Sequence, residues 1–136
     1  MTLLQTLIVV GGVLHLSITS AGLTMTRVLD WRTNLATLNP LTRHIVWTHG
    51  GFVLLTIIAF GVLSLTQSAA LASGSSLGRA CCGFIAVFWG SRLVVQFLLF
   101  DARPHLTNRW LAAGYHGLTV VFAFFTAVYG WGAVRP

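Results

Sequence analysis

Long apolar runs, broken only by short polar stretches, make up most of the sequence. Four runs lie near residues 3–28, 42–66, 79–100 and 109–133. A helix needs roughly 20 apolar residues to cross a hydrocarbon core about 30 Å thick, and each run is long enough. The pattern predicts an all-α integral membrane protein, a four-helix bundle that forms one transmembrane domain over residues 1–136.

The polar stretches between the runs are predicted to be loops. Asn39-Pro40 closes the first loop, and proline suits the first position of a helix because its missing N–H would have no partner there. The second loop, around 66–76, is small and polar and is expected to be a plain connector. In the third, either Thr107 or Asn108 can cap the last helix.

Composition agrees with a membrane protein. The chain is 56% hydrophobic and 7% charged, whereas soluble domains carry about 25% charged residues. The first run has no charged segment before it and exceeds the roughly 7–15 apolar residues of a signal peptide, so we expect a retained helix. Aromatic residues near the predicted ends of the spans form an expected interfacial belt, namely Trp31, Trp47, Trp110, Tyr129 and Trp131.

Arginine accounts for all of the positive charge, because the chain has eight Lys or Arg residues and none is lysine. These arginines flank apolar spans and form no basic stripe, which argues against nucleic-acid binding. Most fall at one pair of helix ends, namely Arg27, Arg32, Arg43, Arg103 and Arg109, whereas Arg79 and Arg135 fall at the other. Positive short loops stay cytoplasmic, so we expect the loops between the first and second and between the third and fourth spans to face the cytoplasm and both termini to lie outside. The expected location is the bacterial inner membrane.

A weak internal repeat relates the two halves of the chain. Residues 29–32 and 100–103 share an Asp-x-Arg pattern, and each is followed by an arginine and then a His-Gly pair, His49-Gly50 or His116-Gly117. The bundle is therefore interpreted as two helical hairpins that an ancestral duplication could have produced.

Ionisable residues inside membrane spans are costly and need an explanation. His49 and His116 each lie about 10 Å from the expected cytoplasmic end of their helices, Arg92 about 13 Å and His15 about 18 Å, at 1.5 Å per residue. Gln96 is nearer that side. We expect one polar layer that receives a residue from every helix.

The two histidines next to glycine suggest a cofactor. In an antiparallel ring, the second and fourth helices lie on a diagonal, so His49 and His116 would face each other and could ligate the iron of haem b. Arg92 could pair with a propionate or with a quinone carbonyl. We therefore expect His49 and His116 as metal ligands, and Arg92, His15 and Gln96 as further cofactor-binding residues.

Each of these residues also has a plainer interpretation. His15 could bond a backbone carbonyl, and His49 and His116 could be satisfied core histidines. Arg92 could extend to the interface or pair with another subunit. The only acids, Asp30 and Asp101, lie at helix ends, so an anionic cofactor, lipid or partner subunit is expected near Arg92. The adjacent Cys81 and Cys82 lack C-x-x-C spacing and are expected to serve packing.

Three functions remain open from the sequence. The first is a b-type haem or quinone-linked electron-transfer subunit. The second is a non-redox structural or accessory subunit of a larger membrane complex or homo-oligomer in membrane lipid. The third is a small transporter or metal-binding protein. The chain contains no H-E-x-x-H, G-x-S-x-G or phosphate-loop motif, which argues against independent catalytic activity.

Overall fold

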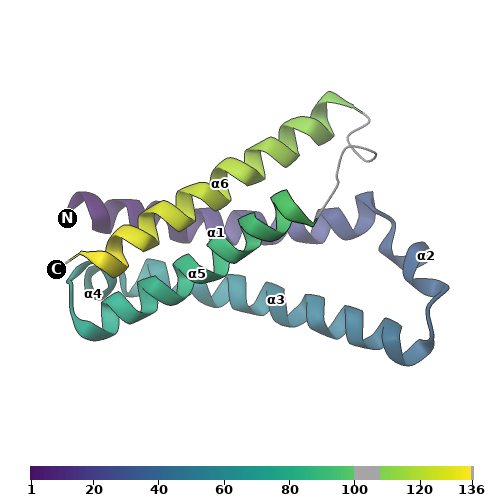
Figure 1. The fold of residues 1–136 in the computed structure, drawn as a ribbon, viewed down its shortest axis with the longest axis horizontal. Coiled ribbons are helices and arrows are strands. Elements are labelled where there is room, and N and C mark those ends of the chain that lie inside the picture. Colours follow the sequence, from purple (N-terminus) through teal and green to yellow (C-terminus); the bar gives the residue numbers. More distant parts are fainter. Residues whose placement is uncertain (100–107, 136) are drawn as a thin grey trace.

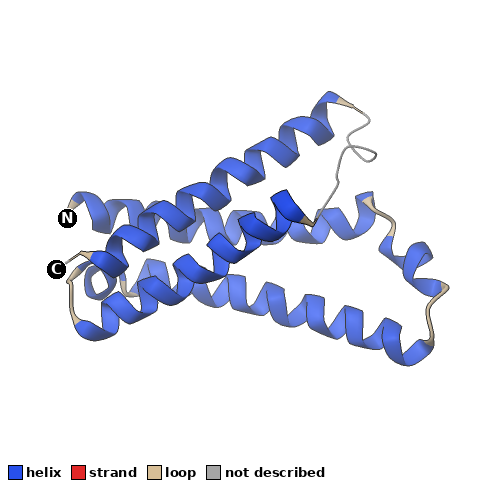
Figure 2. Ribbon diagram, viewed as in Figure 1, coloured by secondary structure: helices blue, strands red, loops and turns tan. Residues whose placement is uncertain are grey.

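Four long helices form the protein in a computed structural model, which describes residues 1–99 and 108–135. Within these residues there are helices and loops but no strand (Figure 2). The long helices are α1 (Leu3–Val28), α3 (Pro40–Thr66), α5 (Ser76–Leu98) and α6 (Arg109–Val134). Each is long and apolar enough to cross a membrane. The predicted all-α, four-helix membrane fold is confirmed, with α3 and α5 starting slightly earlier than expected.

Side chains just before the helices determine where they start. Asn39 accepts a hydrogen bond from the backbone N–H of Leu41 at 2.9 Å, and Pro40 takes the first helical position as expected. Asn108 accepts one from the Leu111 N–H at 2.8 Å and so caps α6. Thr107, the other candidate cap, lies outside the described residues.

Two short helices occupy stretches that the sequence presented as loops, α2 (Trp31–Ala36) and α4 (Ser68–Ala72). The expectation of a plain connector at 66–76 was wrong, because α4 buries Leu71 and packs against α1 and α5. Alanine and leucine favour helix strongly enough to continue helical structure after the break at Gln67.

The long helices pack as two hairpins, α1 with α3 and α5 with α6. Both termini and α4 lie at one end of the molecule, the terminal end, where the hairpins meet through contacts of α1 with α6 and of α4 with α5 (Figure 1). At the other end, the α2 end, α3 and α6 diverge (Figure 1). Outward-facing side chains such as Phe52, Phe84 and Val120 are exposed and apolar, as lipid contact requires.

Glycines allow α1 and α3 to cross closely. A Cβ on Gly61 would lie 3.2 Å from the Gly12 carbonyl oxygen and 3.1 Å from the His15 Cβ. A Cβ on Gly12 would meet the side chain of Leu65 at 2.8 Å. Small residues commonly allow such backbone approach between membrane helices, where packing supplies most of the attraction.

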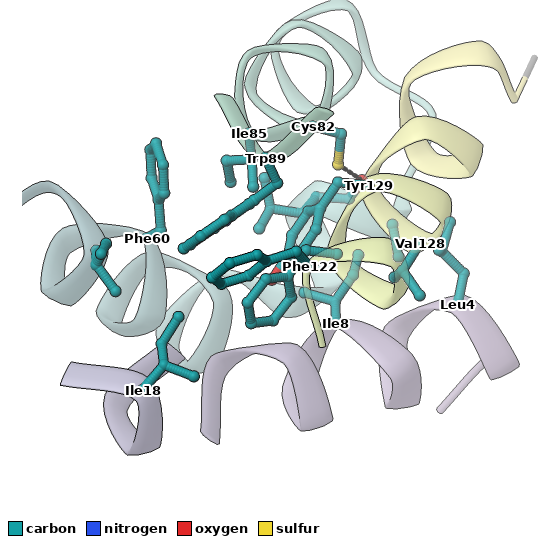
Figure 3. Packing of buried hydrophobic residues seen from close by; sticks show 14 residues of the cluster. Leu4, Ile8, Ile18, Phe60, Cys82, Ile85, Trp89, Phe122, Val128 and Tyr129 are labelled. Atoms are coloured by element: carbon teal, nitrogen blue, oxygen red, sulfur yellow. Dashed lines mark hydrogen bonds between the residues drawn. The ribbon is translucent and has the colours of Figure 1, made fainter. Parts of the chain in front are cut away.

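Aromatic side chains fill the space between the hairpins on the terminal side (Figure 3). Trp89 of α5 stacks on Phe122 of α6 with ring centroids 4.8 Å apart, and both are buried. Tyr129 is also buried, and its hydroxyl pairs with that of Ser64 at 2.6 Å. Tyr129 therefore belongs to the core and not to the interfacial belt expected from the sequence.

Candidate functional site

His15 lies at the centre of the aromatic core. Its Nδ1 is 2.7 Å from the Gly11 carbonyl oxygen, which can only accept, so Nδ1 carries the proton. Its Nε2 accepts a hydrogen bond from Trp89 Nε1 at 2.9 Å. The imidazole also stacks on Phe125 at 3.9 Å. Through these two hydrogen bonds His15 joins α1 to α5, and a role for it in binding a cofactor stays a prediction.

Gln96 links α5 to α6 at a position nearer the C-terminal end of α5 than Trp89. Its buried side chain donates from Nε2 to Thr119 Oγ1 at 2.5 Å, and Thr119 donates in turn to the Tyr115 carbonyl at 3.0 Å. Gln96 does not line the cavity described next. A role for it in holding a cofactor stays a prediction.

A cavity of about 660 Å³ opens between the hairpins on the side of the core that faces the α2 end. Its walls are mainly apolar and include Ile18, Leu54, Ile57, Phe88 and Leu118. Of the residues placed in the polar layer from the sequence, His49 and Arg92 line it. The cavity thus combines an apolar interior with a basic side chain and an imidazole.

Arg92 lines the cavity and follows Trp89 by about one turn of α5. It is partly buried, and its guanidinium carbon lies 5.7 Å from the centroid of the Phe122 ring, within the range of a cation–π interaction. A guanidinium has five N–H donors, so it can take part in several interactions at once. Asp101, the acid whose relation to Arg92 was considered from the sequence, lies outside the described residues, as do Arg103 and His105.

His49 contributes from α3, on the opposite hairpin. The next two residues are Gly50 and Gly51, which also line the cavity. A Cβ on Gly51 would meet no atom within 4 Å, so the wall beside the imidazole is open. His49 and Gly51 are both exposed, so the cavity is open to the surroundings on this side.

His116 lies elsewhere. It is exposed on α6, its ring contacts that of the neighbouring Tyr115 at 5.4 Å, and it does not line the cavity. His49 and His116 therefore do not share a cavity lining, and their helices α3 and α6 diverge toward the α2 end (Figure 1). His15 lies in the aromatic core, His49 and Arg92 line the cavity, and His116 is exposed on α6, so the residues expected in one polar layer lie in three environments. Haem ligation by both histidines stays a prediction.

In the part of the chain that the structure describes, no metal-binding cluster adds to the site, and the two cysteines do not line the cavity. The described residues contain no group of three or more His, Cys, Asp or Glu side chains that could hold a metal ion. Cys82 is buried, and its thiol lies 3.5 Å from the Leu71 carbonyl oxygen that it can donate to (Figure 3). Both cysteines are unbridged, as a packing role implies.

Sequence reasoning missed two features of the site. Trp89 was given no role, although its spacing of three from Arg92 places both side chains on one face of a helix. Trp31 and Trp47 were expected only as interfacial residues, yet both line the cavity and their ring centroids lie 5.6 Å apart.

The chain matches no protein-family model, and comparisons with curated proteins and with solved structures give no match.

Proposed function

We propose that this small integral membrane protein binds a lipophilic quinone in the cavity between its hairpins and serves quinone-linked electron transfer. The observation that carries the proposal is that both Arg92 and His49 line a cavity that is otherwise mostly apolar. A lipophilic quinone likewise combines a few polar groups with apolar surface, because its ring carries two carbonyl acceptors and is joined to an apolar chain.

Size and chemistry both fit this ligand class. Small-molecule sites usually measure about 300–1,000 Å³ and combine apolar walls with a few polar groups that fix orientation. The cavity, at about 660 Å³, is of that kind. Arg92 can donate to a carbonyl oxygen, and the imidazole of His49 can donate a hydrogen bond or exchange the proton that accompanies quinone reduction. Phe88 and Phe122 offer apolar ring surfaces beside these groups.

Binding to the two polar side chains is open to direct measurement. Decylubiquinone would be titrated into the protein in lipid nanodiscs, with equilibrium binding followed for wild type and variants. We expect Arg92→Gln to weaken binding about tenfold or more, because hydrogen bonds to charged groups contribute about 1.5–3 kcal/mol. His49→Ala should weaken it about fivefold, since it removes one neutral hydrogen bond of about 1 kcal/mol.

The matched control is His116→Ala, which removes an imidazole outside the cavity and should leave binding unchanged. Thermal melts of each variant separate a lost contact from a lost fold. Equal affinities for wild type, Arg92→Gln and His49→Ala would contradict the proposal and favour the structural-subunit function.

Haem b is the second candidate, favoured by His49, the imidazole that lines the cavity. Ligation by both histidines would require His116 to reach the same space. Protein expressed with ample haem would be tested for Soret absorbance and by a pyridine haemochrome assay. A Soret band that is lost in both His49→Ala and His116→Ala would replace quinone by haem, whereas its absence from wild type leaves the quinone proposal standing.

A further inference from the structure

Three arginines from three successive helices lie together at the α2 end. Arg27 is in the last turn of α1, Arg32 is in α2 and Arg43 is in the first turns of α3. One cavity of about 500 Å³ is lined by Arg32, Ala36, Arg43 and Trp47. A second, of about 430 Å³, is lined by Thr26, Arg27, Asp30, Arg32 and Trp47. Because Arg32 and Trp47 belong to both, the cavities adjoin, and we refer to them jointly as the arginine pocket.

The backbone turn at Asp30 helps to create this grouping. Asp30 has a φ of 51°, in the left-handed region, and α2 follows it directly. The short helix then returns the chain toward α3, where Arg43 Nη1 donates to the Ala36 carbonyl at 3.4 Å. The order α1, turn, α2, α3 thus brings three separated arginines to one place.

Within residues 1–99 and 108–135, positive charge in the arginine pocket exceeds negative charge. Of these residues, one acid, Asp30, lines the pocket, against three guanidinium groups. Among the described residues, Asp30 forms no ion pair with any of these arginines, and Arg27 and Arg32 donate no side-chain hydrogen bond. Several charged donors are therefore available to an anion.

The surroundings identify the kind of anion. The pocket lies at the ends of two membrane-spanning helices, beside the Trp31–Trp47 pair, whose rings suit the boundary between headgroups and hydrocarbon. Just along α3, Leu41 and Ile45 are exposed and apolar, as a surface for acyl chains would be. A phosphate next to these groups would belong naturally to a lipid.

We propose that the arginine pocket binds the phosphate of an anionic membrane phospholipid. Arginine forks match phosphate oxygens in a bidentate manner, and basic pockets between membrane helices suit anionic headgroups. Thr26 and Trp47 also line the cavity in which we propose that a quinone binds, so the arginine pocket adjoins that cavity. The proposal is independent of the quinone, because the arginine pocket does not include Arg92 or His49.

Native mass spectrometry of the detergent-purified protein, titrated with phosphatidylglycerol or phosphatidylcholine, tests this site. We expect phosphatidylglycerol to bind more tightly than phosphatidylcholine. The double variant Arg32→Gln/Arg43→Gln should lower phosphatidylglycerol affinity about 25-fold, because each arginine contributes about fivefold near an anionic surface. Arg32→Lys/Arg43→Lys keeps the charge but loses the planar forks, so its affinity should fall between those of wild type and the glutamine variant.

Arg109→Gln is the matched control, since it removes an arginine at the same end of the molecule but outside the arginine pocket. It should change affinity less than about twofold. Arg27→Gln provides a second test that leaves the Arg43–Ala36 bond intact, with an expected loss of about fivefold. Equal binding of the two lipids, equal losses in Arg109→Gln and in the pocket variants, or displacement of the lipid by millimolar inorganic phosphate would overturn the assignment.

Discussion

Replacing Trp89 with alanine is expected to lower the free energy of unfolding by about 3 kcal/mol. The side chain is buried, stacks on Phe122 at 4.8 Å and donates to His15 at 2.9 Å. Lipid is as apolar as the core, so the loss comes mainly from packing, from the cavity left behind and from the broken hydrogen bond. The midpoint of an SDS titration in mixed micelles measures the change.

Two further variants separate these contributions. Trp110→Ala removes the same side chain where it is 87% exposed, and should change stability by less than about 0.5 kcal/mol. Trp89→Phe keeps an aromatic ring but removes the indole N–H that His15 accepts, and should cost about 1 kcal/mol. A Trp89→Ala loss no larger than that of Trp110→Ala would show that this core does not hold the hairpins together.

Introducing leucine at Gly61 is expected to destabilise the protein by about 3 kcal/mol. Even a Cβ there would lie 3.0 Å from Leu16 Cδ2 and 3.2 Å from the Gly12 carbonyl oxygen. The rest of a leucine side chain could fit only if α1 and α3 moved apart, which would also disturb His15 beside the crossing. The same SDS titration reports the effect.

Gly51→Leu is the matched control on the same helix. A Cβ at Gly51 meets no atom within 4 Å, so stability should change by less than about 1 kcal/mol. Similar losses at Gly51 and Gly61 would mean that leucine is poorly tolerated throughout α3, and would contradict a specific close crossing at Gly61.

The four spans could be predicted from sequence because the lipid itself sets their length and composition. Any stretch of about 20 apolar residues must satisfy its backbone hydrogen bonds internally, and a helix does so. The capping residues of α3 and α6 were also recognisable, since Asn39 and Asn108 act locally. The α4 helix was not, because a few small residues look the same in a helix and in a loop.

The candidate site was only partly accessible from sequence. The list of costly intramembrane polar residues included Arg92 and His49, which line the cavity. Depth along a helix does not give the angle between helices, so the divergence of α3 and α6 toward the α2 end could not be predicted. The Trp89 partner of His15 was missed for a related reason, since a tryptophan in a span looks like one more apolar residue.

Photolabelling with a photoreactive azidoquinone in lipid nanodiscs tests the central claim, quinone binding between the hairpins, most directly. The account predicts labelled peptides from the cavity walls, in α3 around His49–Leu54 and in α5 around Phe88–Arg92. Excess decylubiquinone should suppress this labelling, and Arg92→Gln should reduce it. Labelling spread over the outward faces, for example around Val120 and Phe84, and unaffected by the competitor would contradict the claim.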